Sequence, residues 1–312
     1  MPRAYLFTAF GGPETEAFAE LPRPVPGPGQ LLVAVRAAGV NPADWKQRTG
    51  HRSIGAPVTP LPSVFGREVA GVVEEVGADV TEFAVGDAVF GHPLTGAYTE
   101  FTLLPADATA HKPDALSWAD AATLPVAAAT AYDAIHQFGL PAGATLLVNG
   151  VGGGVGVAAA QIARHDGLTV LGTASAAKKD FAEFLGVTYV APGDGVADRV
   201  RAAAGPGGVD AVLDLVGGES LRALAGLLTD RARLVSGADR QLVAELGGAP
   251  IHRRRNAEVL DAVAALVADG SLNPFVTRTF PFAQADLALR AVEEGHTRGK
   301  IVIEFPQVDL PR

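Results

Sequence analysis

The sequence predicts an α/β fold with two parts: a β-rich, barrel-like domain and a doubly wound parallel sheet covered by helices. Two different sequence patterns, one on each side of Ser117, predict this division. Up to about residue 117, short strand-like runs are separated by Gly and Pro, which is typical of a barrel. After Ser117, strand-like and helix-like runs alternate, which is typical of a parallel sheet.

The β-rich part is expected to contain several short strands. They are predicted at 3–8, 31–40, 69–76, 87–90 and 96–104. Gly77 and Gly86 mark turns between them. Prolines alternate with other residues over 22–28, and this stretch forms a stiff connection that cannot join a central sheet.

The alternating part begins with a helix that Ser117 is placed to cap. This Ala-rich stretch is interrupted at Pro125 and is expected to end at Phe138, before Gly139. Further strands are expected at 146–148, 168–173, 187–190, 209–213 and 233–236, and helices at 155–165, 177–185, 195–204 and 219–228. The last elements are expected to be a helix at 257–268, a strand at 275–280, a helix at 284–294 and a strand at 300–304.

Composition excludes several classes of function. The 312 residues, 48% of them hydrophobic, are enough for two cores. A net charge of −9 makes nucleic acid and anionic membranes poor partners. No apolar run reaches the length of a membrane span, and residues 1–5 lack a signal-like core, so we expect a soluble, cytoplasmic protein acting on a small molecule. The chain has no cysteine, which excludes disulfides, thiolate zinc ligands and a cysteine nucleophile.

Residues 144–164 carry the most informative motif. A short apolar strand, Leu146 to Val148, is followed by a glycine-rich turn and then by a helix from Val155. The glycines of the turn are Gly150, Gly152, Gly153, Gly154 and Gly156. Glycines let a pyrophosphate approach the main chain, and the helix N-terminus offers free N–H groups. The pattern is a variant of the dinucleotide fingerprint; the alternative is a loop that only packs the helix on the sheet.

The end of the second strand of this domain predicts which dinucleotide binds. An NAD site usually has a carboxylate there, but residues 172–179 contain none. They offer the Ser175 hydroxyl and then Lys178 and Lys179, which a 2′-phosphate would complement. We therefore expect NADPH. The alternative is that Ser175 only caps a helix and both lysines are solvated.

Five stretches in the expected order carry a family resemblance. They are residues 41–50, 65–77, 85–91, 96–100 and 297–302. Together they resemble the medium-chain dehydrogenase/reductase superfamily, in its zinc-independent quinone oxidoreductase branch. The resemblance implies a GroES-like β-barrel domain made of residues 1–117 and 265–312, and a Rossmann domain of residues 118–264 that binds NADP. It also implies an active site in the cleft between the two domains.

The resemblance implies roles for individual residues. Asn41 and Asp44 would face the nicotinamide end of the cofactor. The other residues expected to contact the cofactor are Thr130, Gly150, Gly152, Gly153, Gly154, Val155, Gly156, Thr173, Ser175, Lys178, Lys179, Val216, Ser236, Gly237 and Lys300. Within this set the glycines would hold the pyrophosphate, Thr130 the nicotinamide amide, and Ser175 with Lys179 the 2′-phosphate, with Lys178 as the alternate lysine.

The sequence departs from the family in two places. Zinc-dependent relatives have a Cys near Asn41 and a His at the position of Arg67; both are missing, so no metal is expected. The remaining histidines at 51, 92 and 111 match no ligand motif and are interpreted as surface residues. Residues 251–256 are polar where relatives have an apolar strand that helps form a dimer. A homodimer is therefore left open, and this charged run is expected to be solvated.

The function that the resemblance implies is hydride transfer from NADPH to a quinone, an enone or a related conjugated carbonyl. Without a metal, hydrogen-bond donors must polarise the substrate, and Asn41, Trp45, Arg48 and Tyr98 are the candidates. Asn41, Asp44 and Arg48 are the expected catalytic residues. Two alternatives stay open: an enoyl-thioester or alkene reductase that uses Arg48 and Arg52 at the mouth of the site, and an NADPH-binding sensor without turnover.

Overall fold

The computed structural model describes residues 1–51, 59–295 and 297–306. The chain forms two compact units. The barrel unit comprises Met1–Val126, Arg255–Ala268 and Phe275–Arg312, and the sheet unit comprises Ala127–Arg254 and Asp269–Pro274. The described residues contain no helix that is both long and apolar enough to cross a membrane.

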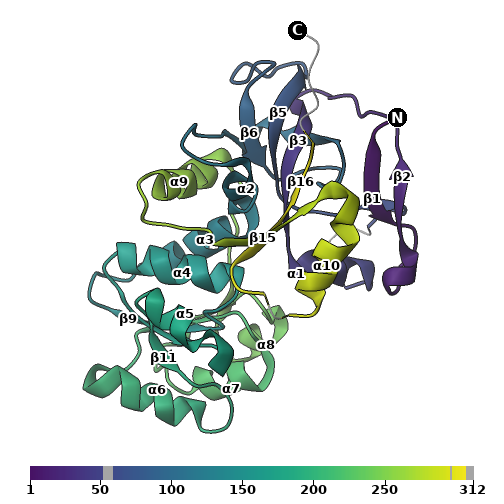
Figure 1. Cartoon of the computed structure of the whole chain (residues 1–312). Coiled ribbons are helices and arrows are strands. Elements are labelled where there is room, and N and C mark those ends of the chain that lie inside the picture. The colour runs from purple at the N-terminus through teal and green to yellow at the C-terminus, as the bar shows by residue number, and fades with distance from the viewer. Residues whose placement is uncertain (52–58, 296, 307–312) are drawn as a thin grey trace. The chain divides into compact units, whose positions relative to one another are not determined.

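The barrel unit is built on two antiparallel sheets with one parallel strand pair (Figure 1). Its strands are β1 (Arg3–Phe7), β2 (Glu16–Glu20), β3 (Gln30–Val40), β4 (Ser63–Val64), β5 (Val69–Val76), β6 (Ala88–Gly91), β7 (Phe101–Pro105), β8 (Thr109–His111), β15 (Val276–Pro281) and β16 (Lys300–Glu304). The larger sheet has the order β15-β16-β3-β5-β6-β8, with β7 also paired to β3, and the smaller has the order β2-β1-β4. Its helices are α1 (Pro42–Arg48), α2 (Trp118–Ala121), α9 (Ala257–Ala268) and α10 (Ala285–Glu293).

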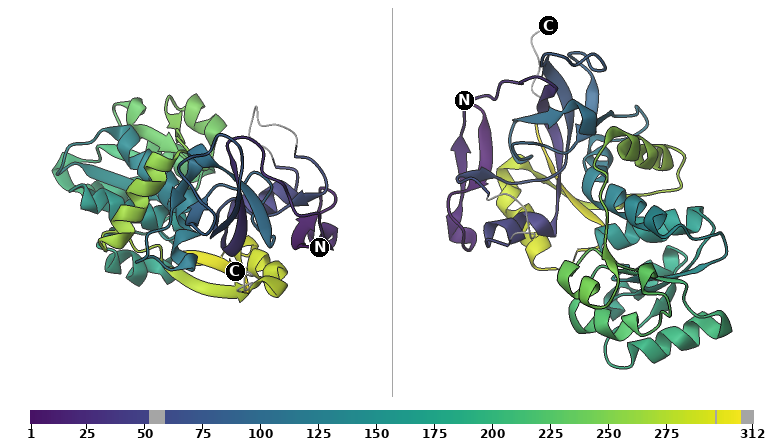
Figure 2. Two further views of the ribbon diagram at one scale, coloured as in Figure 1. Left: turned by 90° about the horizontal axis from the view of Figure 1, so that it is seen from above. Right: turned by 180° about the vertical axis from the view of Figure 1, so that it is seen from behind.

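The end of the chain returns to the barrel unit, as expected. Strand β16 pairs antiparallel with β3, with Ile301 opposite Val40 and Ile303 opposite Ala38, and Figures 1 and 2 show the two strands side by side. Alternation in both strands places apolar side chains in the buried cluster around Phe7 and Phe65. The resemblance to a GroES-like domain is confirmed.

Three details of the barrel unit differ from the expected strands. The predicted strand at 96–104 begins only at Phe101, because Gly96, at φ +91°, makes a tight turn whose carbonyl accepts from the Thr102 hydroxyl at 2.6 Å. Strands β2 and β8 had no alternating apolar pattern strong enough to predict them.

The sheet unit is a six-stranded parallel sheet with the order β11-β10-β9-β12-β13-β14. Its strands are β9 (Thr145–Asn149), β10 (Thr169–Thr173), β11 (Thr188–Val190), β12 (Ala211–Asp214), β13 (Leu234–Ser236) and β14 (Ala249–Pro250). Its helices are α3 (Ala129–Phe138), α4 (Gly154–His165), α5 (Lys179–Phe184), α6 (Val196–Ala204), α7 (Gly218–Ala225) and α8 (Arg240–Glu245). Strand order reverses between β9 and β12, and parallel sheets bind their ligands at such a switch point.

Most of the elements predicted after Ser117 are present. Ser117 caps α2 by accepting from the Asp120 N–H, and Gly139, Gly167 and Gly186 adopt positive φ where helices end. Pro125 falls in a five-residue π-helical turn, Leu124–Ala128, that separates α2 from α3. The Rossmann-like parallel sheet is therefore confirmed. Helix α8 and the short β14 were not predicted.

The two units divide the chain at other residues than the expected domains do. The expected Rossmann domain, 118–264, included α2 and most of α9. In the structure α2 lies against β3 and β5, and α9 lies against β8. The sequence of a helix does not show which sheet the helix will pack against. The boundaries of the two units therefore differ from those of the expected domains.

Candidate functional site

The glycine-rich turn joins β9 to α4 and has the geometry of a phosphate cradle. Gly150 has φ +95°, a conformation that side chains disfavour. A Cβ on Gly156 would meet the Gly150 carbonyl oxygen at 2.4 Å, so the turn packs this closely only with glycine. A Cβ on Gly153 would instead find no atom nearer than 3.8 Å. The turn is therefore tight on its inner side and open beside Gly153, where the free N–H groups of the first turn of α4 begin. This arrangement fits a pyrophosphate.

A polar network joins the carboxyl ends of four neighbouring strands. Asp214, at the end of β12, is fully buried and accepts from Asn149 Nδ2 at 2.7 Å and from Ser236 Oγ at 2.6 Å. Thr173 Oγ1 donates to Asn149 Oδ1 at 2.6 Å. Asn149, Thr173 and Ser236 end the three flanking strands, so the network holds the loops at the switch point in fixed positions.

The network changes the interpretation of two expected cofactor residues. The hydroxyls of Thr173 and Ser236 are engaged with Asn149 and Asp214, so their position favours a role in shaping the loops. Asn149 and Asp214 themselves were not predicted. The signal that could have found them is a polar residue at the last position of successive buried strands.

The loop after β12 reaches the glycine turn. Asp214 accepts from the backbone N–H groups of Val216, at 3.2 Å, and Gly217, at 3.1 Å. Val216 is 57% exposed, and its Cγ2 lies 3.0 Å from where a Cβ on Gly150 would stand. Gly150 and Val216, both expected at the cofactor, are thus brought together. Gly237 follows β13, and a Cβ there would meet Ile251 Cδ1 at 2.8 Å.

The two lysines after β10 have different surroundings. Lys178 lies across the glycine turn: its Nζ donates to the Gly152 carbonyl at 3.1 Å, and its Cδ is 2.5 Å from where a Cβ on Gly152 would stand. Lys179 is half-exposed, with its Nζ 3.8 Å from Glu183 Oε1 and 5.9 Å from the centroid of the Tyr189 ring. Tyr189 comes from the neighbouring strand β11 and was not predicted at the site.

Ser175 begins the turn that carries these lysines. It is exposed and precedes the short 3-10 helix Ala176–Lys178. Its side chain makes no cap hydrogen bond to that turn. The arrangement therefore does not support the alternative in which Ser175 serves only as a helix cap.

The charged segment after β14 is anchored to α3 by two of its arginines, while His252, Arg254 and Arg255 remain exposed, in keeping with the expected solvated run. Asp133 of α3 is 4% exposed and accepts from the backbone N–H of Arg254 at 3.0 Å and from its Nε at 2.9 Å. Arg253, whose side chain is 17% exposed, donates to the Thr130 hydroxyl and lies 3.4 Å from Asp133. A buried carboxylate on α3 thus pairs with both arginines and anchors the segment that follows β14.

A buried ionic cluster lies in the barrel unit around Asn41. Lys300 Nζ is 2.7 Å from both Asn41 Oδ1 and Glu68 Oε1, and Asn41 Nδ2 donates to Glu68 Oε1 at 2.8 Å. Glu68 Oε2 accepts from the Val126 N–H at 2.7 Å. All three side chains are at most 5% exposed. Lys300 was expected at the cofactor, but its ammonium is surrounded by these acceptors, so the geometry favours a role in holding Asn41.

Asp44 lies beside this cluster at the start of α1. It forms a capping box with Asn41, accepting from the Asn41 N–H at 2.9 Å, and accepts from the Tyr98 hydroxyl at 2.9 Å. Burial raises the pKa of Asp44 to about 6, against the charge of Arg67 and these two hydrogen bonds, which lower it. Arg67 Nε lies 3.7 Å from Asp44 Oδ1, and its side chain is 42% exposed.

Arg48 occupies a different environment from the one expected of a catalytic residue. Its side chain is 1% exposed and pairs with Glu16 and, at 2.7 Å, with Glu293. Its Nε also donates to the Gly11 carbonyl at 3.2 Å. The guanidinium joins β2, α1 and α10, so the geometry favours a structural role. Arg52 lies outside the described residues.

The histidines considered as metal ligands lie apart from one another. His92 Nδ1 is 3.3 Å from the Arg67 carbonyl, His111 Nε2 is 3.2 Å from the Glu82 carbonyl, and His51 is exposed. Among the residues that the structure describes, no three His, Asp or Glu side chains gather into a metal site.

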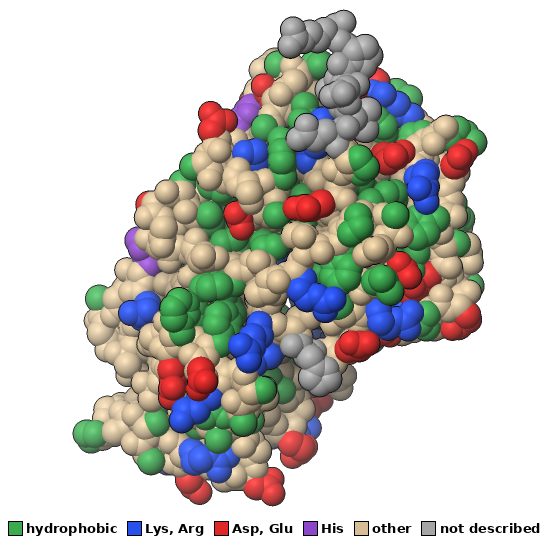
Figure 3. Space-filling model, in the orientation of Figure 1, with side chains coloured by type: hydrophobic (Ala, Val, Ile, Leu, Met, Phe, Trp, Pro, Cys, Tyr) green, Lys and Arg blue, Asp and Glu red, His purple; other side chains and the backbone are tan. Residues whose placement is uncertain are grey.

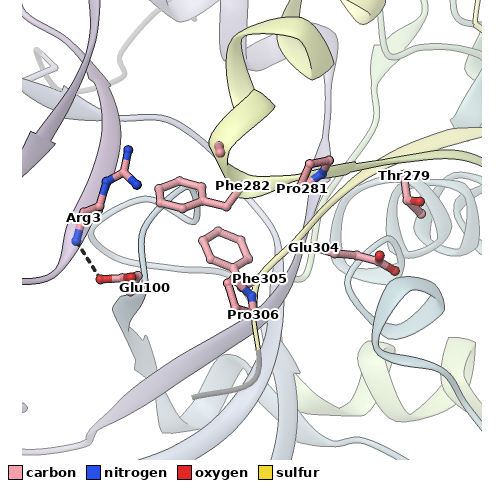
Figure 4. Close-up of a pocket in the computed structure, with 9 residues that line it drawn as sticks. Arg3, Glu100, Thr279, Pro281, Phe282, Glu304, Phe305 and Pro306 are labelled. Atoms are coloured by element: carbon pink, nitrogen blue, oxygen red, sulfur yellow. Dashed lines mark hydrogen bonds between the residues drawn. The ribbon is translucent and has the colours of Figure 1, made fainter. Parts of the chain in front are cut away.

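One pocket of the barrel unit contains none of the expected site residues. Figure 3 shows acidic and basic side chains interspersed over one face. Figure 4 shows a pocket of about 430 Å³ whose apolar wall includes Phe282 and Phe305 and whose rim includes Arg3 and Glu304. None of its lining residues was expected at the cofactor or substrate, so we do not assign it a part in the reaction.

Similarity to known proteins covers nearly the whole chain. Residues 27–114 match the model of the alcohol dehydrogenase GroES-like domain, and residues 185–303 match that of zinc-binding dehydrogenases. The rat synaptic vesicle membrane protein VAT-1 homolog is 31% identical over 343 residues, which cover 96% of this chain and 83% of the relative. The polyketide synthase GfsB of Streptomyces halstedii is 37% identical over 295 residues, which cover 89% of this chain but 5% of that protein.

A solved structure agrees with these relatives. The quinone oxidoreductase of Coxiella burnetii is 30% identical, has a TM-score of 0.88, and is matched over 97% of this chain and 99% of its own. The relative and this fold each extend across both the barrel unit and the sheet unit described above. The chain therefore belongs to the medium-chain dehydrogenase/reductase superfamily, in its zinc-independent quinone oxidoreductase branch, a group of oxidoreductases whose fold binds a nicotinamide cofactor.

Proposed function

We propose that the protein transfers hydride from NADPH to a quinone, an enone or a related conjugated carbonyl. The observation that carries this proposal is the glycine turn at the switch point of the sheet, open beside Gly153 and flanked by Ser175 and two lysines. When bound, NADPH supplies the hydride. The protein's part is to hold the cofactor and the acceptor and to stabilise the charge that develops on the acceptor.

Each part of the proposed cofactor site has a physical role. The N–H groups that begin α4, together with Gly153, would hold the pyrophosphate. Val216 presents an exposed apolar side chain beside the turn. Thr130, placed by Arg253, would hold the nicotinamide amide. The network of Asn149 and Asp214 keeps these loops in place without touching the cofactor.

The preference for NADPH over NADH rests on charge at the end of β10. Ser175 and Lys179 are exposed there, and Tyr189 lies next to Lys179. A 2′-phosphate would gain charge-assisted hydrogen bonds from this group, whereas a ribose hydroxyl would gain little. Residues 172–179 provide no carboxylate to accept from that hydroxyl.

The cofactor preference is tested by titrating NADPH and NADH into wild type and Lys179→Ala. We expect the variant to lose about tenfold in NADPH affinity, roughly one charge-assisted hydrogen bond, with NADH unchanged. Arg201→Ala is the matched control, because Arg201 is 57% exposed on the same unit, close to the 52% of Lys179. Equal affinity of wild type for both dinucleotides would contradict the proposed preference.

Turnover is tested by screening acceptors with NADPH oxidation as the readout. Benzoquinones and α,β-unsaturated ketones should be reduced, while saturated ketones should be poor acceptors. NADPH binding without oxidation across the panel would instead favour the sensor alternative.

An enoyl-thioester reductase is the second function that an observation favours. The similarity to polyketide synthases reaches 37% identity, although the chain spans only 5% of the synthase in question. The CurK enoyl reductase, at 24% identity and a TM-score of 0.86, shares the fold. Comparing an enoyl thioester with its free enone at equal concentration separates the two functions, since a thioester reductase should prefer the former by at least tenfold in kcat/KM.

A further inference from the structure

We propose that the side chains of Gln137 and Asp133 on helix α3 close the outer edge of strand β14 and so keep the sheet from pairing with a second copy of the chain. Strand β14 ends the order of the parallel sheet, and an unpaired strand edge is a ready template for another strand. All residues involved lie in the sheet unit. The inference concerns association of the protein and does not depend on which acceptor it reduces.

One backbone hydrogen bond shows which groups of this segment face outward. The Ile251 N–H donates to the Ser236 carbonyl of β13 at 3.2 Å, which continues the pairing of Ser236 with Pro250. In an extended strand, the backbone groups of successive residues point to opposite edges. Those of Pro250 and His252 therefore face away from β13, at the edge where a further strand would add.

Side chains of α3 satisfy these outward groups in place of a strand. Gln137 Nε2 donates to the Pro250 carbonyl at 3.1 Å, and Gln137 Oε1 accepts from the His252 N–H at 2.9 Å. One carboxamide thus acts as donor and acceptor, as the backbone of a neighbouring strand would. Asp133 Oδ2 then accepts from the Arg254 N–H at 3.0 Å. Proline at position 250 has no N–H that would need a partner.

The spacing along α3 matches the spacing along this edge. Asp133 and Gln137 are four residues apart on one face of the helix, a rise of about 6 Å. His252 and Arg254 are two residues apart, a rise of about 6.6 Å in a strand. Two side chains from successive turns of the helix can therefore reach two successive outward N–H groups.

Ion pairs hold this arrangement in place. Asp133 is 4% exposed and pairs with the guanidinium groups of Arg253 and Arg254, at 3.4 and 2.9 Å. A strand of a second copy could take the place of Asp133 only by separating this carboxylate from both cations, and an uncompensated buried charge is strongly destabilising. The backbone hydrogen bonds gained in exchange are neutral and weaker. The edge therefore stays closed in the wild-type protein.

The first test follows single amides by hydrogen exchange in wild type and Gln137→Ala. Loss of one neutral hydrogen bond should speed exchange of the His252 N–H by about five- to tenfold, whereas the Ile251 N–H, bonded to β13, should keep its rate. Gln161→Ala is the matched control and should leave both rates unchanged. Gln161 holds the backbone of Asn273 in the same two-way manner, with both bonds 2.9 Å long, but Asn273 lies in no strand. An unchanged rate at His252 in Gln137→Ala would overturn the inference.

The second test combines sedimentation velocity with the same exchange measurement over a range of protein concentrations. In wild type, exchange at His252 and Arg254 should be independent of concentration. In the double variant Asp133→Ala, Gln137→Ala the edge is open, so higher concentration should produce a species of two chains and slow exchange at both amides. Gln161→Ala should behave as wild type. Wild-type edge amides that become protected at high concentration, or a folded double variant that stays a single chain, would contradict the inference. If the double variant does not fold, Gln137→Ala in the first test decides, because it keeps the ion pairs of Asp133.

Discussion

Replacing Gly153 with valine should abolish cofactor binding while leaving the protein folded. Gly153 is the N-cap of α4, with φ −95° and ψ 167°, an extended conformation that valine also adopts. A Cβ there has no neighbour within 3.8 Å, so the turn itself accommodates the side chain. The new side chain would, however, stand where the pyrophosphate approaches the main chain.

The two effects can be separated by their magnitudes. Losing glycine at an N-cap costs up to about 1 kcal/mol, and the stiffer unfolded chain returns about 0.4–1 kcal/mol, so the free energy of unfolding should change by less than about 1 kcal/mol. NADPH at about 100 times its dissociation constant stabilises a folded protein by about 2.7 kcal/mol. If affinity falls about 100-fold, the same concentration stabilises the variant by only about 0.4 kcal/mol.

The assay is chemical denaturation of wild type and Gly153→Val with and without NADPH, together with direct titration of the cofactor. Gly207→Val is the control, because a Cβ on Gly207 also meets nothing within 4 Å but lies outside the turn. Gly156→Ala gives the opposite pattern, since its Cβ would collide with the Gly150 carbonyl and destabilise the apo protein. Unchanged NADPH affinity in Gly153→Val would refute the assignment of this turn as the pyrophosphate cradle.

Three further predictions follow from buried charges. The rise in the pKa of Asp44 from 3.8 to about 6 corresponds to about 3 kcal/mol of stability that is present below about pH 4 and lost as the pH rises through 6. The difference in unfolding free energy between wild type and Asp44→Asn should change by this amount between pH 4 and 7, and a pH-independent difference would argue against it. Arg48→Met should lower the free energy of unfolding by about 3 kcal/mol or more, because two carboxylates lose their cation. Adding Glu16→Gln to this variant should restore part of the lost stability. A loss of kcat without a loss of stability would instead assign Arg48 to the substrate. Asp214→Asn should lower the free energy of unfolding by about 1–3 kcal/mol and weaken NADPH binding, because an amide cannot accept from all the donors around Asp214. Wild-type NADPH affinity in a calorimetric titration of this variant would show that the loops keep their positions without the Asp214 carboxylate.

Local features of the fold were predictable because they depend on neighbouring residues. The spacing of the glycines predicts the β9–α4 turn, and Ser117 predicts the N-cap of α2. Long apolar strands such as β3 and β5 were equally clear. Short elements without an apolar pattern, such as β2 and α8, depend on partners distant in sequence and were missed.

The polar groups of the site show the same division. Ser175 and Lys179 were predicted as 2′-phosphate residues because an acid is missing from their stretch of sequence. The burial of Arg48 and Lys300 against carboxylates could not be predicted, because a charged residue near a motif has the same sequence whether it faces solvent or a buried carboxylate.

By itself the sequence determined the two-part α/β architecture, the glycine-rich turn between β9 and α4 and the family, since each is encoded in residues close together along the chain. Only the tertiary structure decided that Asp214 holds the switch-point loops, that the 251–254 segment is clamped by Asp133, and that Arg67 is the exposed charge beside Asn41. These facts depend on which distant side chains meet and how much water reaches them, and burial and pairing are properties of the packed chain.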